Sequence, residues 1–402
     1  MPDVSTSQSK PQAAPARRAR EPVGRPFYGL IDAVLVPDPA AFDFDGAVAE
    51  SHAQALWTWM SRDLAPDLMR LDLGPEDPAA RAALDLVIPE IIGRAREAAR
   101  AVYSDTEAER RLIMQMGGEG PYHRLPVLLN ALKCRNLLEK AQSFGRATNA
   151  MTDEAALGQA LQSMPLNDPV VSALLLQSAV GQVSHPGRLM AAVIRMAGGA
   201  TEPAIVRAGF GPLVDAIFSQ AQAQVPALQQ FGAFADIDMV CRAIDRFHRL
   251  MRSVMGFVEL NRLSRWSSVA AGLTTTVSEL VEPKLRDVGP SINLALRRPS
   301  GTDRVDSEQL LAALNGCYVL ATVRDCRDSL ALNALFDQTW QQVGQALEIH
   351  VQRNLELFRS KPSDRVTGQR LDAAIKMAEL RFNGEYAEVL RRARDSAERR
   401  VS

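Results

Sequence analysis

Three arginines and a histidine on one predicted helix are the first candidates for chemistry in this sequence. Arg242, Arg246 and Arg249 follow one another at spacings of four and three residues, which places them on one side of an α-helix. Guanidinium groups donate paired hydrogen bonds to phosphates and carboxylates, so this arginine row could hold a small anion. His248 lies next to the row, three residues after Asp245.

Acidic residues on the same helix favour another interpretation of the arginine row. Asp238 precedes Arg242 by four residues, and Asp245 precedes Arg249 by four. An acid placed N-terminal to a base at this spacing forms a surface pair that contributes roughly 0.2–0.5 kcal/mol. The pattern therefore favours a solvated, ion-paired face over an anion site. A single Asp-x-x-His pair without a second matching pair is also weak evidence for a metal or acid–base role of His248.

A second candidate lies in the loop of residues 116–126, the most irregular stretch in the first half of the chain. Glycine-rich loops can bind phosphate through exposed backbone N–H groups. Here no predicted strand precedes the glycines and no Gly-Lys-Ser/Thr follows them, so neither a dinucleotide fingerprint nor a P-loop is present. The loop is predicted to be a corner between helices. If it binds a ligand instead, the functional groups are those of Glu119, Tyr122, His123 and Arg124.

Known catalytic and metal-binding motifs are absent from the sequence. It contains no G-x-S-x-G, H-E-x-x-H, Walker, kinase or EF-hand pattern, and its five histidines form no paired motif. We therefore expect no metal and no cofactor, and we name no catalytic residue. An enzyme stays an open alternative, because Asp and Arg side chains from distant parts of a chain can meet in three dimensions.

The arginine row belongs to an amphipathic helix predicted from Asp236 to Trp266. Its apolar residues recur every three or four positions and form one broad face opposite the arginines. That face is wider than the two-position seam of a coiled coil, so we expect a core helix with several neighbours. Its apolar residues are Ile237, Val240, Ile244, Phe247, Met251, Val254, Met255 and Val258.

The composition of the 402-residue chain favours helices and gives no general affinity for nucleic acid. Hydrophobic residues make up 47% and aromatic residues only 5%, and an apolar content drawn mainly from Ala, Leu, Val and Met favours helix over sheet. The net charge is −1, so no overall field attracts nucleic acid. A helix-turn-helix motif within residues 186–218 would need a more basic recognition helix than the three arginines there provide. No nucleic-acid partner is expected.

Helix-start patterns divide the chain into regions. Asp, His or Thr followed by Pro or an acidic residue marks helix starts near residues 153, 168, 185 and 201. Residues 27–36 have a strand-like composition but no visible partner strand, so we expect an extended or short helical segment there. The fold class is predicted to be all-α, a multi-helix bundle or irregular α-solenoid with long antiparallel helix pairs toward the C-terminus. The regions are a disordered basic arm (1–25), an N-terminal helical region (26–150), a central helical domain (151–298), a long helical hairpin (299–360) and a C-terminal helical hairpin (361–402).

Two features predict the cellular compartment. The first 26 residues lack the apolar core of a secretory signal, and no run of about 18 apolar residues that could span a membrane occurs. Cys134, Cys241, Cys317 and Cys326 are scattered and form no C-x-x-C pair, a usage typical of reducing compartments. The sequence thus predicts a cytoplasmic protein without a transmembrane segment.

The leading functional hypothesis is a non-enzymatic interaction protein, a scaffold or regulatory adaptor of a bacterial-type cytoplasm. Wide apolar helix faces without attached chemistry suit contact with a protein partner or with a second copy of the chain. The alternative is an all-α enzyme or small-anion binder with a pocket near residues 236–266, or one that uses the 116–126 loop. A third hypothesis is weak peripheral membrane contact through the basic arm, residues 1–25.

Overall fold

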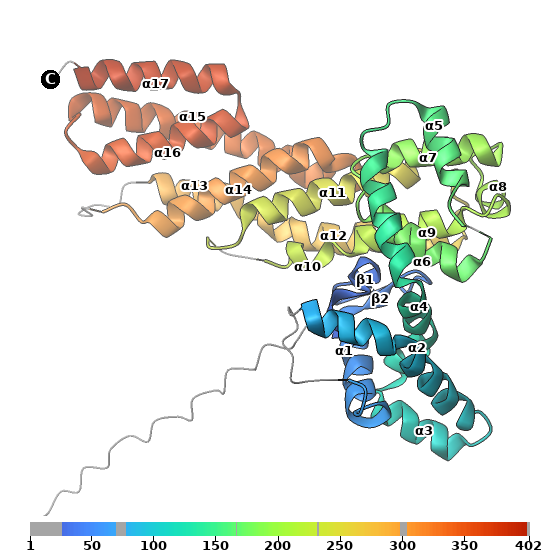
Figure 1. Cartoon of the computed structure of the whole chain (residues 1–402). Coiled ribbons are helices and arrows are strands. Elements are labelled where there is room, and N and C mark those ends of the chain that lie inside the picture. The colour runs from blue at the N-terminus through green and yellow to red at the C-terminus, as the bar shows by residue number, and fades with distance from the viewer. Residues whose placement is uncertain (1–25, 70–77, 166, 231–232, 298–303, 400–402) are drawn as a thin grey trace, which may run out of the picture.

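The computed structural model describes residues 26–69, 78–165, 167–230, 233–297 and 304–399, and these are almost entirely helical (Figure 1). The all-α class predicted from the sequence is confirmed. The predicted basic arm at 1–25, with its membrane contact, and the predicted boundary at residues 298/299 lie outside the described residues.

An N-terminal lobe lies within residues 26–148, and its described part is built around four α-helices and a minimal sheet. In Figure 1 it lies, in blue and teal, on one side of the remaining helices. Its elements are η1 (Pro26–Gly29), η2 (Asp32–Val34), β1 (Leu35–Val36), β2 (Val48–Ala49), α1 (Glu50–Trp59), the π-helical turn η3 (Met60–Leu64), α2 (Pro78–Ala101), α3 (Thr106–Gln115) and α4 (Glu119–Thr148).

A larger C-terminal lobe, residues 154–399, extends from α5, α7 and α8 at one end to α15, α16 and α17 at the other (Figure 1). Its elements are α5 (Glu154–Gln162), α6 (Pro169–Val180), α7 (Pro186–Ala197), α8 (Glu202–Arg207), α9 (Gly211–Gln222), α10 (Val225–Leu228), α11 (Ile237–Met255), α12 (Arg265–Arg286), α13 (Val288–Leu296), α14 (Ser307–Cys326), η4 (Arg327–Ser329), α15 (Asn333–Ser360), α16 (Arg365–Arg381) and α17 (Gly384–Arg399).

Helices begin at the four predicted starts, and capping hydrogen bonds from side chains mark two of them, at Asp153 and Asp168. The side chains of Asp153, Asp168 and Asp306 each accept hydrogen bonds from two backbone N–H groups of the helix that follows. Such N-caps satisfy donors that have no partner within the helix. Pro169 and Pro186 each begin a helix, where the missing N–H is not needed. Local sequence therefore fixes where these helices begin.

The helix α6 belongs to the hydrophobic cores of both lobes. Leu174, Leu175 and Ala179 pack in the N-terminal core, whereas Leu176 and Val180 pack in the C-terminal core. Its most extensive neighbours are α4 on one side and α9 on the other. A helix that is apolar on all sides has to be buried, and α6 is buried almost completely from residue 172 to residue 180.

Residues 27–36 differ from the expectation in one respect. Short helical turns occur there as predicted, but the segment also has a strand partner, because Leu35 and Val36 pair in parallel with Val48 and Ala49. The partner is only two residues long, too short for an alternating pattern that a sequence could reveal.

The helix expected from Asp236 to Trp266 is two helices, α11 and α12, separated by residues 256–264. The intervening turn is held on α8, since the Glu202 carboxylate accepts hydrogen bonds from the Asn261 N–H at 2.8 Å and from the Ser264 hydroxyl at 2.7 Å. Ser264 also caps α12 by accepting a hydrogen bond from the Ser267 N–H. Tertiary contacts thus replace the helical hydrogen bonds of this turn.

The long helices α14 and α15 are arranged differently from the expectation that they would pair with each other. We expected the two helices within residues 299–360 to pair mainly with each other, but α15 packs chiefly on α16, and α14 packs chiefly on α13 and α11. Phe358 lies beside Gly368, and the Arg381 guanidinium lies beside Gly344, so α15 and α16 run antiparallel. None of the described helices combines the length and the apolar character needed to span a membrane.

Candidate functional site

The helix α11 presents most of the predicted apolar face to the core, whereas Met255, its last residue, is 45% exposed and Val258 lies beyond its end. Asp236 caps it by accepting a hydrogen bond from the Met239 N–H at 3.0 Å. Val240, Ile244 and Phe247 are completely or almost completely buried. The arginine row therefore lies on the side of α11 that faces away from the main core, where its partners can be described one by one.

Two of the three arginines form the predicted ion pairs. Arg242 pairs with Asp238 at 2.6 Å, and both side chains are 72% exposed. Arg249 pairs with Asp245 at 2.6 Å and also donates a hydrogen bond to the Ser184 carbonyl oxygen at 3.2 Å. Exposed pairs of this kind contribute little to stability, so Arg242 is a solvated surface residue.

Arg246 has a different role from its neighbours in the row. Its guanidinium donates hydrogen bonds to the carbonyl oxygens of Val180, at 2.9 Å, and Val183. These carbonyls lie at the C-terminal end of α6, where backbone oxygens lack helical partners and the helix dipole favours a positive charge. Burial, with help from the nearby charge of Arg249, lowers the pKa of Arg246 to about 10, so the group stays charged at neutral pH. Arg246 thus caps the helix α6 from another element.

His248 is held as a neutral packing residue. Its Nδ1 atom lies 2.9 Å from the hydroxyl oxygen of Ser329, which is itself buried. Burial, followed by the positive charge of Arg252, lowers the pKa of His248 below its usual value. The described residues contain no group of three or more His, Cys, Asp or Glu side chains placed to hold a metal ion.

The candidate residues of the 116–126 loop do not converge on one point. The corner predicted there consists of Gly117 and Gly118, both with positive φ, and α4 already begins at Glu119. The Tyr122 hydroxyl donates a hydrogen bond to Glu109 of α3 at 2.8 Å. Arg124 pairs with Asp43 at 2.6 Å and donates to the Phe44 carbonyl oxygen.

These contacts give the loop residues structural roles. Tyr122 ties α4 to α3, and Arg124 ties α4 to the segment that precedes β2. His123 is exposed, and its ring meets that of Tyr122 edge-on. Glu119 stands in the first turn of α4, where an acidic residue complements the helix dipole.

A groove of about 600 Å³ between α7 and α11 brings together basic residues that the sequence did not link. We call it the basic groove. His248 and Arg249 of the predicted site line it, together with Arg252 from the next turn of α11. His185 and Arg188 enter from the start of α7. The lining residues of the basic groove are His185, Pro186, Gly187, Arg188, His248, Arg249, Arg252, Ser253, Gly256 and Phe257.

One part of the basic groove could have been recognised in the sequence. Arg252 extends the row by three residues beyond Arg249, and helical spacing alone places it on nearly the same side. The sequence gives no sign that α7 residues join the groove, because Arg188 lies 61 residues before Arg249 and no helical spacing links them. Arg242 and Arg246 do not line the groove.

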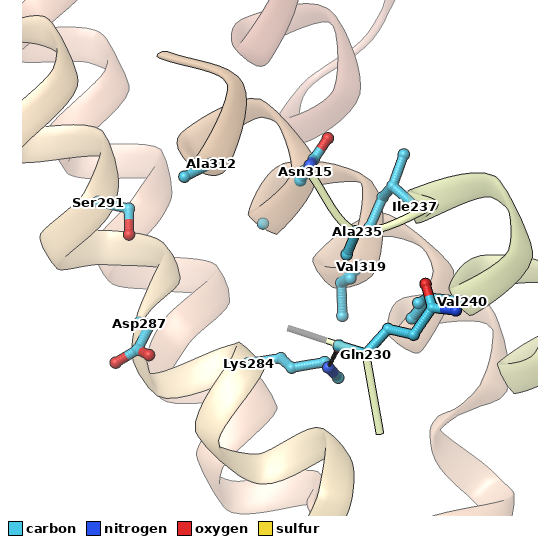
Figure 2. Close-up of a pocket in the computed structure, with 11 residues that line it drawn as sticks. Gln230, Ala235, Ile237, Val240, Lys284, Asp287, Ser291, Ala312, Asn315 and Val319 are labelled. Carbon is cyan, nitrogen blue, oxygen red and sulfur yellow. Dashed lines mark hydrogen bonds between the residues drawn. The ribbon is translucent and has the colours of Figure 1, made fainter. Parts of the chain in front are cut away.

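A smaller cavity of about 160 Å³ lies between α11, α12, α13 and α14 (Figure 2). The Lys284 ammonium donates a hydrogen bond to the Gln230 carbonyl oxygen, and burial lowers the pKa of Lys284. The Asn315 amide donates to the Ala233 carbonyl oxygen at 3.0 Å. Both polar groups hold the backbone that leads into α11, which is a structural role.

Comparison of the chain with protein-family models, with curated proteins and with solved structures finds no match.

Proposed function

We propose that the protein is a helical interaction protein that binds an acidic segment of a protein partner in the basic groove. The observation that carries this proposal is the charge of the groove: three arginines line it, and no carboxylate does. The chain as a whole has a net charge of −1, so this local surplus is not a consequence of overall composition. A cleft lined by one sign of charge attracts ligands of the opposite sign.

The charges of the groove are only partly used within the molecule. Asp245 neutralises much of the Arg249 charge. Arg188 donates a hydrogen bond to the Met151 carbonyl oxygen, which does not neutralise its positive charge. Arg252 is exposed to solvent. A carboxylate that enters between Arg188 and Arg252 would therefore meet two positive charges without a competing acid among the lining residues.

Apolar side chains beside the groove support a peptide rather than a small anion as the ligand. Phe257 lines the groove and is 41% exposed. Met255, two residues before it in the chain, and Leu263, six residues after it, are 45% and 97% exposed. The hydrogen bonds from Asn261 and Ser264 to Glu202 keep the turn between α11 and α12 in place. Exposed apolar groups beside polar ones mark many protein interaction sites.

The proposal includes a cytoplasmic location and a regulatory or scaffolding role. All four cysteines of the chain are free, which suits a reducing compartment. The enzymatic alternative has less support, because His248 is neutral and engaged with Ser329 and the other candidate residues do not converge. No specific observation favours catalysis at this site.

Binding of a designed probe tests the proposal. A short fluorescent peptide that alternates Glu with Leu and Phe is titrated with the protein, and fluorescence anisotropy reports the complex. Arg252→Glu reverses one exposed charge of the groove, and the matched control Arg110→Glu reverses an exposed charge on α3. We expect the groove variant to weaken binding by about tenfold or more, equivalent to ~1.4 kcal/mol, and the control to bind as the wild type does.

Competition identifies the class of ligand. Inorganic phosphate, a DNA oligonucleotide and a Lys-rich peptide of the same length serve as competitors. The proposal predicts that none of them displaces the acidic peptide at moderate salt. Displacement by phosphate at low concentration would indicate a small-anion site, and equal binding of the peptide by wild type and Arg252→Glu would refute the assignment to the groove.

A further inference from the structure

A second cavity, of about 360 Å³, lies at the junction of the two lobes. The segment that precedes β2 covers it, and α4, α6 and α9 supply the remaining walls. We call it the interlobe pocket. Its lining residues are Phe44, Asp45, Gly46, Pro126, Val127, Asn130, Pro169, Val170, Ala173, Gln177, Pro212, Asp215 and Ala216. Its volume falls within the range of about 300–1,000 Å³ found for small-molecule sites.

Gln177 is the unusual residue of this pocket. It lies on α6, the helix shared by both lobes, and its exposed fraction is 0%. Neither the amide oxygen nor the amide nitrogen of Gln177 has a hydrogen-bond partner among the described residues. Buried polar groups without partners are rare in folded proteins, because each loses its hydrogen bonds to water. Such a group needs an explanation.

Another buried glutamine shows how this fold satisfies an amide when the role is structural. Gln222 of α9 is also almost completely buried. Its amide oxygen accepts a hydrogen bond from the Phe42 N–H at 2.8 Å, and its amide nitrogen donates to the Phe42 carbonyl oxygen at 3.0 Å. Gln222 therefore fastens the chain segment that leads to the interlobe pocket. Gln177 lies in the same layer of helices without any equivalent partner.

The other polar groups restrict the charge of a possible ligand. Asp45 and Asp215 line the pocket, and no Lys or Arg does. The Asp215 carboxylate accepts hydrogen bonds from Arg265 at 2.7 Å and from the Trp266 ring N–H at 2.9 Å. An anionic ligand would face two carboxylates, so a neutral ligand fits better. The half-buried Asn130 adds a second carboxamide from α4.

The walls restrict the shape of the ligand. Three prolines, Phe44 and several small aliphatic residues form most of the lining. Gly46 lies so close to α6 that a Cβ atom there would overlap the Ala173 carbonyl oxygen, which keeps the covering segment tightly fixed. A flat apolar molecule with one polar edge matches rigid apolar walls and a single buried amide.

We propose that the interlobe pocket binds a small, neutral, planar molecule whose carboxamide, or an equivalent edge with one donor and one acceptor, pairs with the amide of Gln177. Two amides can exchange two hydrogen bonds, which satisfies both atoms of Gln177 at once. This site is separate from the basic groove and does not depend on the function proposed for it. A ligand here contacts helices of both lobes, so binding also stabilises their junction.

Aromatic amides test the proposal directly. Benzamide and nicotinamide are the probes, and benzoate is the control of the same shape that replaces the amide with a carboxylate. Binding to the full chain is followed by ligand-observed NMR and by the shift in melting temperature. We expect saturable binding of both amides with dissociation constants in the millimolar range, and benzoate to bind at least about tenfold more weakly.

Two variants locate the binding site. Gln177→Met preserves the volume of the side chain but removes the amide, so we expect it to fold with an equal or higher melting temperature and to bind benzamide about tenfold or more weakly. Val170→Trp fills the pocket from a partly exposed wall position and should abolish binding. The matched control Val206→Trp, at an exposed position on α8, should bind as the wild type does.

Three results would overturn the proposal. The first is the absence of saturable binding for both amides, which would leave ordered water as the partner of Gln177. The second is unchanged benzamide binding in Gln177→Met or Val170→Trp. The third is a clear loss of melting temperature in ligand-free Gln177→Met, because it would show that the amide already has a stabilising partner.

Discussion

The guanidinium of Arg246 on α11 donates a hydrogen bond of 2.9 Å to the carbonyl oxygen of Val180, the last residue of α6. A second hydrogen bond reaches the carbonyl oxygen of Val183. Because α6 takes part in both hydrophobic cores, this contact fixes the end of the helix on which the two lobes meet. Arg246, which looked like part of an anion site in the sequence, is therefore a helix cap that comes from a distant part of the chain.

Removal of the Arg246 guanidinium should destabilise the whole fold. In Arg246→Met, the carbonyl oxygens at the C-terminal end of α6 lose a partly buried, charged hydrogen-bond donor. We therefore expect the free energy of unfolding to fall by about 2–4 kcal/mol. The matched control Arg242→Met removes an exposed ion pair and should change it by less than about 0.5 kcal/mol. Urea denaturation followed by circular dichroism measures both. Similar small effects of the two substitutions would contradict a capping role for Arg246.

The crossing of α4 and α6 gives a second prediction. A Cβ atom at Gly145 would overlap the carbonyl oxygen of Ala179, so Gly145→Ala should destabilise the protein by about 1–3 kcal/mol through overpacking. Gly93, in the middle of α2, has no heavy atom within 4 Å of an added Cβ. There the same substitution should stabilise the helix by roughly 0.5–1 kcal/mol. Thermal unfolding of the two variants should therefore shift in opposite directions, and a shift in the same direction would refute this description of the crossing.

A third prediction concerns acid sensitivity at His350 of α15. Its Nε2 atom lies 2.9 Å from the Asn293 amide oxygen, and burial, followed by the charge of Arg353, lowers its pKa. As pH falls through about 6.5, the unfolded chain binds a proton at this position before the folded chain does, so stability is lost on the acid side.

The variant His350→Gln separates this effect from other titrations. Gln can still donate to Asn293 but does not titrate. We expect the unfolding free energy of the wild type to decrease more steeply than that of the variant between about pH 7 and pH 5. Denaturant titrations at several pH values provide both curves. Parallel curves would show that His350 takes up no proton differentially on unfolding.

Much of the fold could be predicted from the sequence because its signals are local. Asp153 and Asp168 cap helices at the expected places. The apolar spacing of α11 identified residues that are buried, including Ile244 and Phe247. Both ion pairs of that helix are also found, because their partners are four residues apart.

The remaining features depend on contacts between distant segments. The carbonyl partners of Arg246 lie 66 and 63 residues earlier in the chain, and no spacing rule links them. Gln177 lies in a helix with apolar residues on all sides. Its hydrophobic periodicity therefore does not distinguish a buried face from an exposed one, and the sequence gives no sign of a pocket there. Part of the basic groove could be predicted, because Arg249 and His248 were identified from the sequence. The residues from α7 could not, because only the packing of α7 against α11 brings them to the groove.

The most direct test of the proposed function is site-specific crosslinking within the basic groove. The photoreactive residue p-benzoylphenylalanine replaces Phe257, which lines the groove, and in a second protein it replaces Tyr103, which is exposed on the N-terminal lobe. Irradiation with the labelled acidic peptide should give a crosslink at position 257 that disappears in Arg252→Glu, and none above background at position 103. Equal crosslinking at both positions, or crosslinking at 257 that persists after the charge reversal, would contradict the proposal.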